Sequence, residues 1–541
     1  MKQLIFLLFL LPLGGFSQSF TEFALNPNGD VSFGDFVEAN GKLYFSAATL
    51  SNNKTGLWVT DGTLNQTMLF SQVFHGGNLF QYDMATLNGK LIFHAEPTPN
   101  DPVNGTELWT SDGTTAGTQL LVDINPGPEP SLISAMIQLG DELFFSADDG
   151  THGEELWKTD GTVAGTMMVK DIQPGENGSL PTNFTVVGST LYFRAIDEVN
   201  GFEIWKTDGT SAGTELVIDL NPGNFGSGGV NLTAFGTQLL FAGSDGTTGQ
   251  ELWITDGTAA GTVQVADVNP GGGNSFPSDI TVNQGQIYFS ANDGVNGVEL
   301  WVSDGTATGT QLVKDLNPGA AHAYPAELLA FHDKVYFAAT DGINGYEIWM
   351  TDGTEAGTTL LLDVFTGADG SNPSDLLQYG TNLYFTASTN ASDRQLYQSD
   401  GSPAGTQIIA PASATNSNPM IGSVFSLSAL YQGDLYFSAS FTAEGRELWR
   451  LSDSGTAIEE AAIFQGMKIF PNPGADLIYV EMAASATQVE IEVLTLLGQV
   501  LSQQSHVGGG AIPVQWQGSP GLYLLRVQAD GETTTRKIVR E

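Results

Sequence analysis

A unit of about 48 residues is repeated nine times in this chain, and one aromatic residue marks the same place in every copy. The spacing is identical in six of the eight intervals between these anchors, and the other two are slightly longer. The longer intervals carry insertions, at residues 96–105 and around residues 410–423. A fixed period of this length is typical of arrays built from one supersecondary unit. The anchors are Trp58, Trp109, Trp157, Trp205, Trp253, Trp301, Trp349, Tyr397 and Trp449.

Each copy has the pattern of four short strands separated by turns. Residues 286–319 show three of them: Gln-Ile-Tyr-Phe-Ser-Ala, Val-Glu-Leu-Trp-Val and Gln-Leu-Val-Lys-Asp-Leu, with Asp-Gly turns between them. A weaker apolar stretch, such as residues 280–282, precedes each Tyr-Phe pair and supplies the fourth strand. The Asp-Gly pairs provide the positive φ angles that tight hairpins need. Four-stranded units of this length predict an all-β fold, a β-propeller with very little helix.

The two ends of the array favour a closed ring over an open solenoid. The ninth unit fades after residues 453–456 and lacks the Leu-Val-x-Asp-Leu-Asn-Pro-Gly segment of its sisters. A matching segment, Thr-Glu-Phe-Ala-Leu-Asn-Pro-Asn-Gly, stands at residues 21–29. We expect this N-terminal strand to complete the last sheet, so that no sheet edge stays open. The prediction is a propeller of nine blades over residues 18–460, in which the eighth unit, with Gln395 and Pro411 at positions that are acidic elsewhere, is the weakest.

The charge balance excludes several classes of partner. Lys and Arg total 18 against 60 Asp and Glu, which gives a net charge of -42. Such a chain repels phosphate backbones and anionic membranes, so we expect no nucleic-acid partner, and dissolved cations suit it better. The absence of cysteine excludes disulfides and sulfur metal sites, and the six histidines show no ligand-like spacing.

Residues 1–17 predict a secretory signal peptide. Lys2 precedes an apolar run at residues 4–13, and small residues before Ser17 suit a cleavage site near that position. The run is too short to cross a bilayer, and no other stretch reaches the roughly 20 apolar residues of a transmembrane helix. We expect a mature chain without a transmembrane segment, secreted or held at the outer cell surface.

The repeated motif resembles that of the ELWxxDGT repeat proteins. Glu-Leu-Trp-Thr-Ser-Asp-Gly-Thr at residues 107–114 and Glu-Leu-Trp-Lys-Thr-Asp-Gly-Thr at residues 155–162 carry the resemblance, which covers about residues 20–456. That family consists of exported bacterial proteins to which no chemistry is assigned. The resemblance therefore implies a fold and not an activity.

Residues 461–541 follow a different pattern of alternating strands, which predicts a small β-sandwich. They resemble the C-terminal sorting domain of the type IX secretion system, found in the Bacteroidota. The resemblance implies export, recognition of the tail by the secretion and sorting machinery of the outer membrane, and removal of the tail. The motif residues that carry it are Pro471, Asn472, Pro473, Gly498, Gly521, Tyr523 and Lys537.

Acidic residues recur at fixed offsets from the anchors, and two interpretations stay open. Recurrence favours a structural role, with Asp capping turns and the strand Glu bonded to a neighbouring Thr or loop backbone. Calcium is the alternative, because it takes six to eight oxygen ligands and suits an exported acidic chain. We predict no other cofactor. The recurring acids are Asp149, Asp245, Asp293, Asp341, Glu155, Glu251, Glu299, Glu347, Asp160, Asp256, Asp304, Asp352, Asp171, Asp267, Asp315 and Asp363.

No catalytic residue can be named, because the chain has no nucleophile elbow, no His-Glu-x-x-His and no phosphate loop. Residues that break the repeat symmetry are better candidates for recognition, and aromatic faces stack on sugars. The first hypothesis is a non-enzymatic, adhesin-like propeller that binds extracellular glycans or proteins. A polysaccharide-active glycosidase or lyase, or a passive structural component of the cell surface, is the alternative. The candidate ligand aromatics are Phe202, Phe225, Phe276, Tyr324 and Tyr346.

Overall fold

The computed structural model separates into two compact units, Phe20–Ser452 on one side and Met1–Ser19 with Asp453–Glu541 on the other. The predicted signal peptide, residues 1–17, lies outside the described residues, and the predicted domain boundaries at 17/18 and 460/461 stay predictions. The structure describes residues 18–26, 29–49, 54–71, 84–95, 105–420, 428–443, 445–452, 468–470, 477–482, 488–494, 500–508, 510–516, 521–529 and 532–540.

The larger unit is all-β, and each repeat forms one antiparallel four-stranded sheet whose strands follow in chain order. The first four sheets are β2 (Val31–Ala39), β3 (Lys42–Thr49), β4 (Lys54–Thr60) and β5 (Met68–Ser71); β6 (Met84–Leu87), β7 (Lys90–Ala95), β8 (Glu107–Ser111) and β9 (Gln119–Val122); β10 (Ser134–Leu139), β11 (Glu142–Asp148), β12 (Glu154–Thr159) and β13 (Met167–Lys170); and β14 (Thr182–Val187), β15 (Thr190–Asp197), β16 (Gly201–Thr207) and β17 (Glu215–Leu216).

The next four sheets repeat this arrangement. They are β18 (Val230–Phe235), β19 (Gln238–Ser244), β20 (Gln250–Thr255) and β21 (Val263–Ala266); β22 (Ser278–Asn283), β23 (Gln286–Asn292), β24 (Val298–Ser303) and β25 (Gln311–Lys314); β26 (Ala326–Phe331), β27 (Lys334–Thr340), β28 (Tyr346–Thr351) and β29 (Thr359–Leu362); and β30 (Ser374–Tyr379), β31 (Asn382–Asn390), β32 (Asp393–Ser399) and β33 (Gln407–Ile408). Among the described residues the only helix is the 3-10 turn η1 (Leu64–Gln66).

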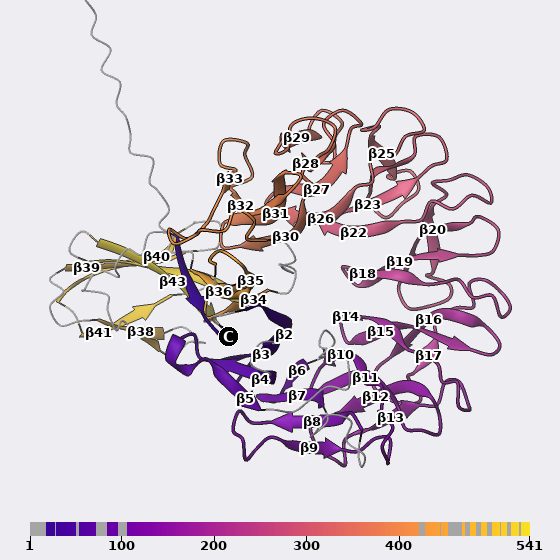
Figure 1. Ribbon diagram of the computed structural model, residues 1–541, viewed down its shortest axis with the longest axis horizontal. Coiled ribbons are helices and arrows are strands. Elements are labelled where there is room, and N and C mark those ends of the chain that lie inside the picture. The colour runs from indigo at the N-terminus through magenta and orange to yellow at the C-terminus, as the bar shows by residue number, and fades with distance from the viewer. Residues whose placement is uncertain are drawn as a thin grey trace, which may run out of the picture. The chain divides into compact units, whose positions relative to one another are not determined.

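The sheets are the blades of a β-propeller. In Figure 1 the first strand of each sheet, such as β14, β18 or β22, lies toward the middle, and the later strands lie progressively farther out. The first strands of neighbouring sheets contact each other from the first sheet to the eighth, and β2 also contacts β34 of the last sheet. Short edge strands such as β17 and β33 end the blades at the outside, where long exposed edges would invite pairing with other chains.

A separate apolar core fills the space between each pair of neighbouring sheets. Between the third and fourth sheets, Phe144 and Leu156 pack against Phe193 and Trp205. The anchor position faces such a core in every repeat: six anchors are buried, and Trp109, Trp157 and Trp301 are half-buried. Both faces of a sheet are covered in this way: Phe145 lies in the core shared with the second sheet and Phe144 in the core shared with the fourth. The second strands are therefore continuous apolar runs.

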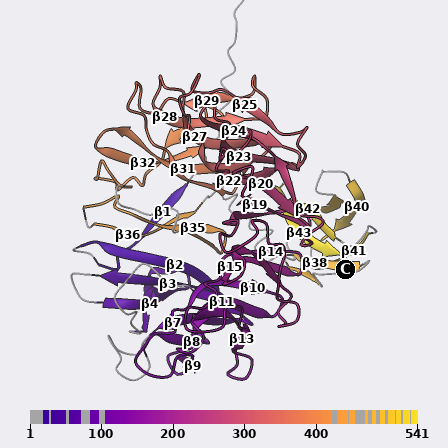
Figure 2. The same cartoon turned by 90° about the vertical axis from the view of Figure 1, so that its right-hand side faces the viewer.

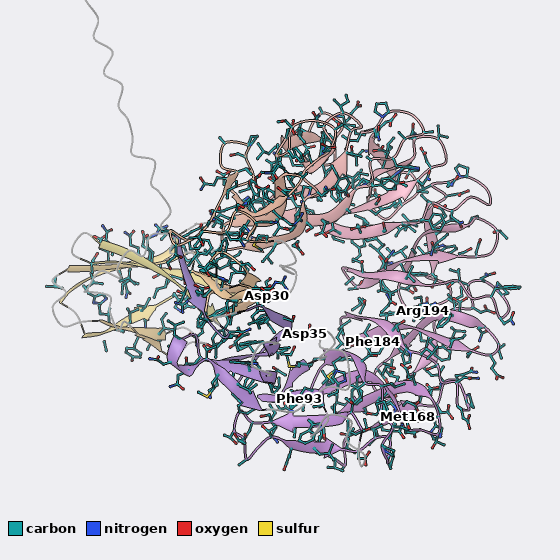
Figure 3. All side chains as sticks on the ribbon, in the orientation of Figure 1. Asp30, Asp35, Phe93, Met168, Phe184 and Arg194 are labelled. Atoms are coloured by element: carbon teal, nitrogen blue, oxygen red, sulfur yellow. The ribbon has the colours of Figure 1, made fainter. Side chains whose placement is uncertain are left out.

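The N-terminal strand belongs to the last sheet, as the sequence predicts. This sheet has the order β1 (Ser19–Phe23), β36 (Glu447–Ser452), β35 (Asp434–Ala439) and β34 (Ala429–Tyr431), and Figure 2 shows β1 beside β36. Asp30, labelled in Figure 3, accepts a hydrogen bond from the Arg446 amide at 2.8 Å, and the Val31 amide donates to the Arg446 carbonyl at 2.8 Å. The two ends of the array are thus joined by backbone contacts.

The junction between the last and first sheets is an apolar core, like the other junctions. Tyr436 and Leu448 of the last sheet share a core with Phe45 and Trp58 of the first sheet, and Phe23 lies in the same cluster. The hydroxyl group of Tyr431 donates to the carbonyl of Gly41 across this junction. The contact surface between the last and first sheets is therefore formed like those inside the array.

The C-terminal residues form a separate β-sandwich. One sheet has the order β37 (Lys468–Phe470), β38 (Leu477–Met482) and β41 (Gly510–Gln515). The other has the order β40 (Val500–Val507), β39 (Gln488–Leu494), β42 (Gly521–Ala529) and β43 (Glu532–Arg540). Side chains from both sheets, among them Ile478, Ile491, Val514 and Leu525, share one core.

Replacing Phe23 by Ala tests ring closure in solution. Phe23 is 2% exposed because β1 is docked in the last sheet, so the change removes buried apolar contacts and leaves a cavity. We expect the free energy of unfolding to fall by about 3–5 kcal/mol in chemical denaturation. The matched control, Phe225→Ala, alters a side chain that is 85% exposed and is expected to stay within about 0.5 kcal/mol. Equal, small effects of both changes would show that β1 is not docked.

Candidate functional site

One face of the propeller is built from the turns between second and third strands and the connections between successive sheets, and we call it the loop face. The two kinds of segment meet there: the amide of Asn292, at the end of β23, donates to the carbonyl of Ser275 in a connection at 2.9 Å. The opposite ends of the strands carry the Asp-Gly-Thr turns, which join third and fourth strands.

The Glu of the repeated Glu-Leu-Trp motif holds the connections of the loop face. Glu155 is fully buried and its carboxylate accepts hydrogen bonds from the amides of Ile172 and Gln173 at 3.1 and 2.9 Å. The hydroxyl of Ser179 donates to the same group at 2.6 Å. Because the acceptor lies in the third strand and all three donors lie after the fourth, the carboxylate ties the chain back onto its own sheet. The strand Glu therefore bonds loop backbone, one of the two partners expected for it.

The same carboxylate recurs in most sheets, and the eighth and last sheets differ from the others in this contact. In the last sheet, Glu447 accepts from the amides of Leu25 and Asn26 at 2.7 and 2.9 Å, so the N-terminal segment takes the place of the missing connection. In the eighth sheet Gln395 replaces it, and its amide donates to the carbonyl of Ser417 at 2.5 Å. The sister carboxylates with amide donors are Glu107, Glu203, Glu251, Glu299 and Glu347.

Burial acts on these carboxyl groups more strongly than their hydrogen bonds do. Desolvation raises the pKa of Glu251 to about 7, while the Ser275 hydroxyl and the amides of Val268 and Asn269 oppose the shift. The pKa values of Glu107, Glu203 and Glu299 are likewise raised to about 7, with burial as the largest cause. The chain thus buries a series of carboxyl groups whose charge is costly near neutral pH.

The Asp residues of the Asp-Gly-Thr turns are turn caps. Asp256 Oδ1 accepts from the amide and the hydroxyl of Thr258 at 2.9 and 2.7 Å, and these two bonds lower the pKa of Asp256. On the loop face, Asp293 Oδ1 accepts from the amides of Val295 and Asn296 at 2.8 and 2.7 Å. Asp256 and Asp293 are therefore turn caps. Asp149 also pairs with the His152 ring at 2.8 Å, and one buried oxygen each of Asp315 and Asp363 has no hydrogen-bond partner among the described residues.

No metal site emerges from these acids within the part of the chain that the structure describes. None of the described Asp, Glu and His residues form a group of three or more arranged to hold an ion. A pocket of about 250 Å³ lies instead at the other end of the strands, between the first and second sheets. Lys42, Asp61, Gln66 and Thr114 supply its polar lining, and it contains none of the candidate aromatics.

Strained backbone positions on the loop face carry exposed apolar side chains. Leu132, Leu180, Phe276 and Tyr324 occupy the same position of their repeats and have φ between 48° and 51°, a left-handed conformation that costs bulky residues about 1–2 kcal/mol. Their exposed fractions are 49, 38, 60 and 55%. Two sister copies have the residues that this conformation favours, Gly228 and Asn372. The fold itself therefore accepts a small or polar residue at this position.

The five candidate aromatics divide into two groups. Phe225, Phe276 and Tyr324 are exposed on the connections. The Phe202 ring lies over the guanidinium group of Arg194, and the distance from Arg194 Cζ to the ring centroid is 3.6 Å. Figure 3 shows Arg194 on the sheet of β14–β17. The hydroxyl of Tyr346 donates to the carbonyl of Tyr324 at 2.6 Å, and burial raises the Tyr346 pKa. The rings of the first group are exposed, and the Tyr324 ring lies 4.9 Å from the ring of His322.

Three carboxylates that the sequence analysis did not single out lie on bulges of the innermost strands. Asp279, Glu327 and Asp375 occupy the same position of three successive repeats and have φ of 49°, 57° and 59°. Asp279 Oδ1 accepts from the Glu327 amide at 3.1 Å, and Glu327 Oε2 accepts from the Asp375 amide at 2.9 Å. The carboxylates therefore link one sheet to the next. Their constant offset from the anchors was the signal that could have identified them.

The predicted sorting motif is described only in part. Pro471, Asn472, Pro473 and Gly498 lie outside the described residues. Gly521 begins β42, and the ring of the buried Tyr523 meets Trp516 edge to face at 4.7 Å. Lys537 lies in β43 opposite Leu524.

Comparison with known proteins identifies the C-terminal segment. Residues 468–541 match the family described as "Secretion system C-terminal sorting domain". No curated protein matches the chain. No helix among the described residues is long and apolar enough to cross a membrane.

The solved structures similar to the chain include a β-propeller domain. A puromycin hydrolase shares 14% identity and a TM-score of 0.33 over 66% of this chain and 58% of its own. The β-propeller domain of the Trilobed protease from Pyrococcus furiosus shares 12% identity and a TM-score of 0.31 over 62% of this chain and 96% of its own. The chain spans less than two thirds of the length of the hydrolase, and likeness at this level says nothing about activity.

Replacing Glu251 by Gln tests the role of the buried carboxylate. The amide nitrogen of Gln would face the donors of Asn269 or Ser275, so we expect a loss of about 1–3 kcal/mol in the free energy of unfolding. The reciprocal change, Gln395→Glu, places a carboxylate opposite the Ser417 carbonyl and is also expected to destabilise. Denaturant titration of both variants measures this, and two neutral substitutions would contradict the assigned role.

The raised pKa values predict how stability depends on pH. A carboxyl group whose folded pKa is about 7 and whose ordinary value is 4.5 binds protons on folding. Its stabilising contribution is fully present below about pH 4.5 and is lost as the pH rises through about 7. We expect Tm to fall between pH 5 and pH 8 at constant ionic strength, with a smaller fall in Glu251→Gln. A Tm that rises over this range would show that the hydrogen-bond donors outweigh desolvation.

Proposed function

We propose that this chain is an exported, non-enzymatic binding protein whose loop face contacts extracellular glycans or proteins in the manner of an adhesin. The C-terminal sorting domain implies export by the corresponding secretion system and contact with its machinery. Delivery of a propeller to the outside of the cell fits a role in contact with external molecules, at the surface or after release.

The observation that carries the proposal is the choice of residue at the strained positions of the loop face. Phe276 and Tyr324 are largely exposed in a left-handed conformation, where sister copies use Gly228 and Asn372. The large side chains therefore weaken the fold without filling a core. Strain that the fold does not require is found most often where a ligand or partner is bound.

Three further proposals accompany this one. The repeats belong with the ELWxxDGT repeat proteins, and cleavage near Ser17 removes a signal peptide. Calcium is a proposed ligand on composition alone, and it is tested by running each binding measurement with calcium and with a chelator. Dependence on calcium would show that recurring acids bind the ion when the partner is present.

The double variant Phe276→Asn with Tyr324→Asn separates binding from folding. Asn tolerates the left-handed conformation. We therefore expect the free energy of unfolding to stay the same or to rise by up to about 1 kcal/mol per site, and Tm to change in the same direction. Saturable binding of the full mature chain to immobilised extracellular glycans and proteins is expected to fall at least about tenfold. Val163→Ser, at an exposed apolar residue of an Asp-Gly-Thr turn, is the matched control.

Three outcomes would contradict the proposal. Equal binding by the double variant and the wild type would place the site elsewhere. Turnover of a polysaccharide would indicate the enzyme alternative, which requires two carboxylates about 5 to 10 Å apart around the scissile bond. Self-association with no saturable binding to any probe would indicate a structural component of the cell surface.

A further inference from the structure

We propose that the ligand of the loop face is a cationic polypeptide segment, whose Lys and Arg side chains lie on Phe276 and Tyr324 and pair with Asp279 and Glu327. This inference rests on the proposed function and names the chemistry of the partner at the same site.

Aromatic and acidic residues alternate at this part of the loop face. Phe276 precedes Asp279 by three residues, and Tyr324 precedes Glu327 by three, on two neighbouring sheets. The Tyr346 hydroxyl bonds the Tyr324 carbonyl, and the charges of Asp279 and Glu327 add to the rise of the Tyr346 pKa that burial causes. The Asp279 carboxylate is bonded to the Glu327 amide at 3.1 Å, so the two acidic residues meet where sheets six and seven adjoin, and each has an exposed ring three residues before it.

The hydrogen bonds that Asp279 and Glu327 accept come from uncharged donors. Asp279 and Glu327 accept hydrogen bonds only from neutral amides of the next sheet in the contacts given above. Neither is in an ion pair with any described residue. Arg394 donates to the Asn372 carbonyl and the Ser374 hydroxyl, at 2.9 and 2.5 Å, and burial lowers the Arg394 pKa, a shift that the charge of Glu327 opposes. Neither carboxylate therefore has a hydrogen-bonded cationic partner among the described residues.

The lysines of the repeats are used at the opposite ends of the strands. Lys206 donates to the Gly257 carbonyl of the next Asp-Gly-Thr turn at 2.8 Å and pairs with Glu215 at 3.0 Å. Lys170 and Lys314 likewise donate to the carbonyls of Thr214 and Thr358 in turns of the following sheets. These lysines are therefore occupied away from Asp279 and Glu327, and the net charge of -42 adds long-range attraction for cations.

The chain contains an internal precedent for the proposed contact. On the loop side of the fourth sheet, the Arg194 guanidinium lies 3.6 Å from the centre of the Phe202 ring. Cations stack favourably on aromatic faces, and Arg does so most often. Phe276 has no such cation among the described residues, and Tyr324 has only the ring of His322 at 4.9 Å. A Lys or Arg side chain of a partner would complete the same arrangement.

The test uses the full mature chain and an Arg-rich peptide of about ten residues, with a Glu-rich peptide and a neutral oligosaccharide as comparison probes. We expect saturable binding of the Arg-rich peptide alone, weakened at least about tenfold between low and physiological salt. Asp279→Asn with Glu327→Gln retains both acceptor oxygens, so the fold and Tm are expected to persist while affinity falls about tenfold.

The charge-matched control is Glu215→Gln with Glu355→Gln, which removes two exposed acids far from the loop face. We expect its affinity to stay within about twofold of the wild type. An equal loss in both double variants would show general attraction to an acidic chain and would overturn the inference.

Failure of this inference and failure of the proposed function are distinguishable. Binding of the neutral oligosaccharide that is lost in Phe276→Asn with Tyr324→Asn, but kept in Asp279→Asn with Glu327→Gln, would overturn the cationic partner and leave the loop face as a binding site. Absence of saturable binding to every probe, together with no effect of either double variant on the wider glycan and protein panel, would overturn both.

Discussion

The buried carboxylate of the Glu-Leu-Trp motif is the interaction on which the rest of the propeller depends. A connection between two sheets has backbone amides that no strand can pair, and burying them without partners costs free energy. Glu155 satisfies such amides from inside its own sheet, and Glu447 does the same for the N-terminal segment. The contact that shapes each connection is therefore also the contact that joins the two ends of the array.

Repetition and departure from repetition have different meanings in this chain. Residues that recur from copy to copy, such as Asp256 and Glu251, are bound to neighbouring backbone and define the scaffold. Residues that differ between copies are free to serve recognition. Phe276 and Tyr324 stand where sister copies have Gly and Asn, the residues that suit this backbone conformation. The backbone strain that they add is therefore not required by the fold. This contrast locates the candidate site on the loop face around the sixth and seventh sheets.

Lysines and acids have different partners in this chain. Lysines such as Lys206 and Lys314 bond carbonyls between neighbouring sheets at the Asp-Gly-Thr end. The Asp residues of those turns accept from their own turn, as Asp256 does. At the loop face, Asp279 and Glu327 accept from amides of the next sheet. The acidic composition, which at first only excluded nucleic acids, therefore serves different contacts at the two ends of the sheets.

The sequence by itself determined the repeat, its four strands, the position of the anchors and the segment that completes the last sheet. These features follow from local periodicity and turn residues, which act within one unit. Only the tertiary structure decided that Phe202 covers Arg194, that Tyr346 is bonded to Tyr324, and that Phe276 and Tyr324 stay exposed. Arg194 and Phe202 lie on the adjacent strands β15 and β16 of one sheet, and Tyr324 directly precedes the sheet that contains Tyr346. Which side chains meet and which stay exposed depends on the direction of each side chain and on the sign of φ at single residues, and neither follows from the repeat pattern.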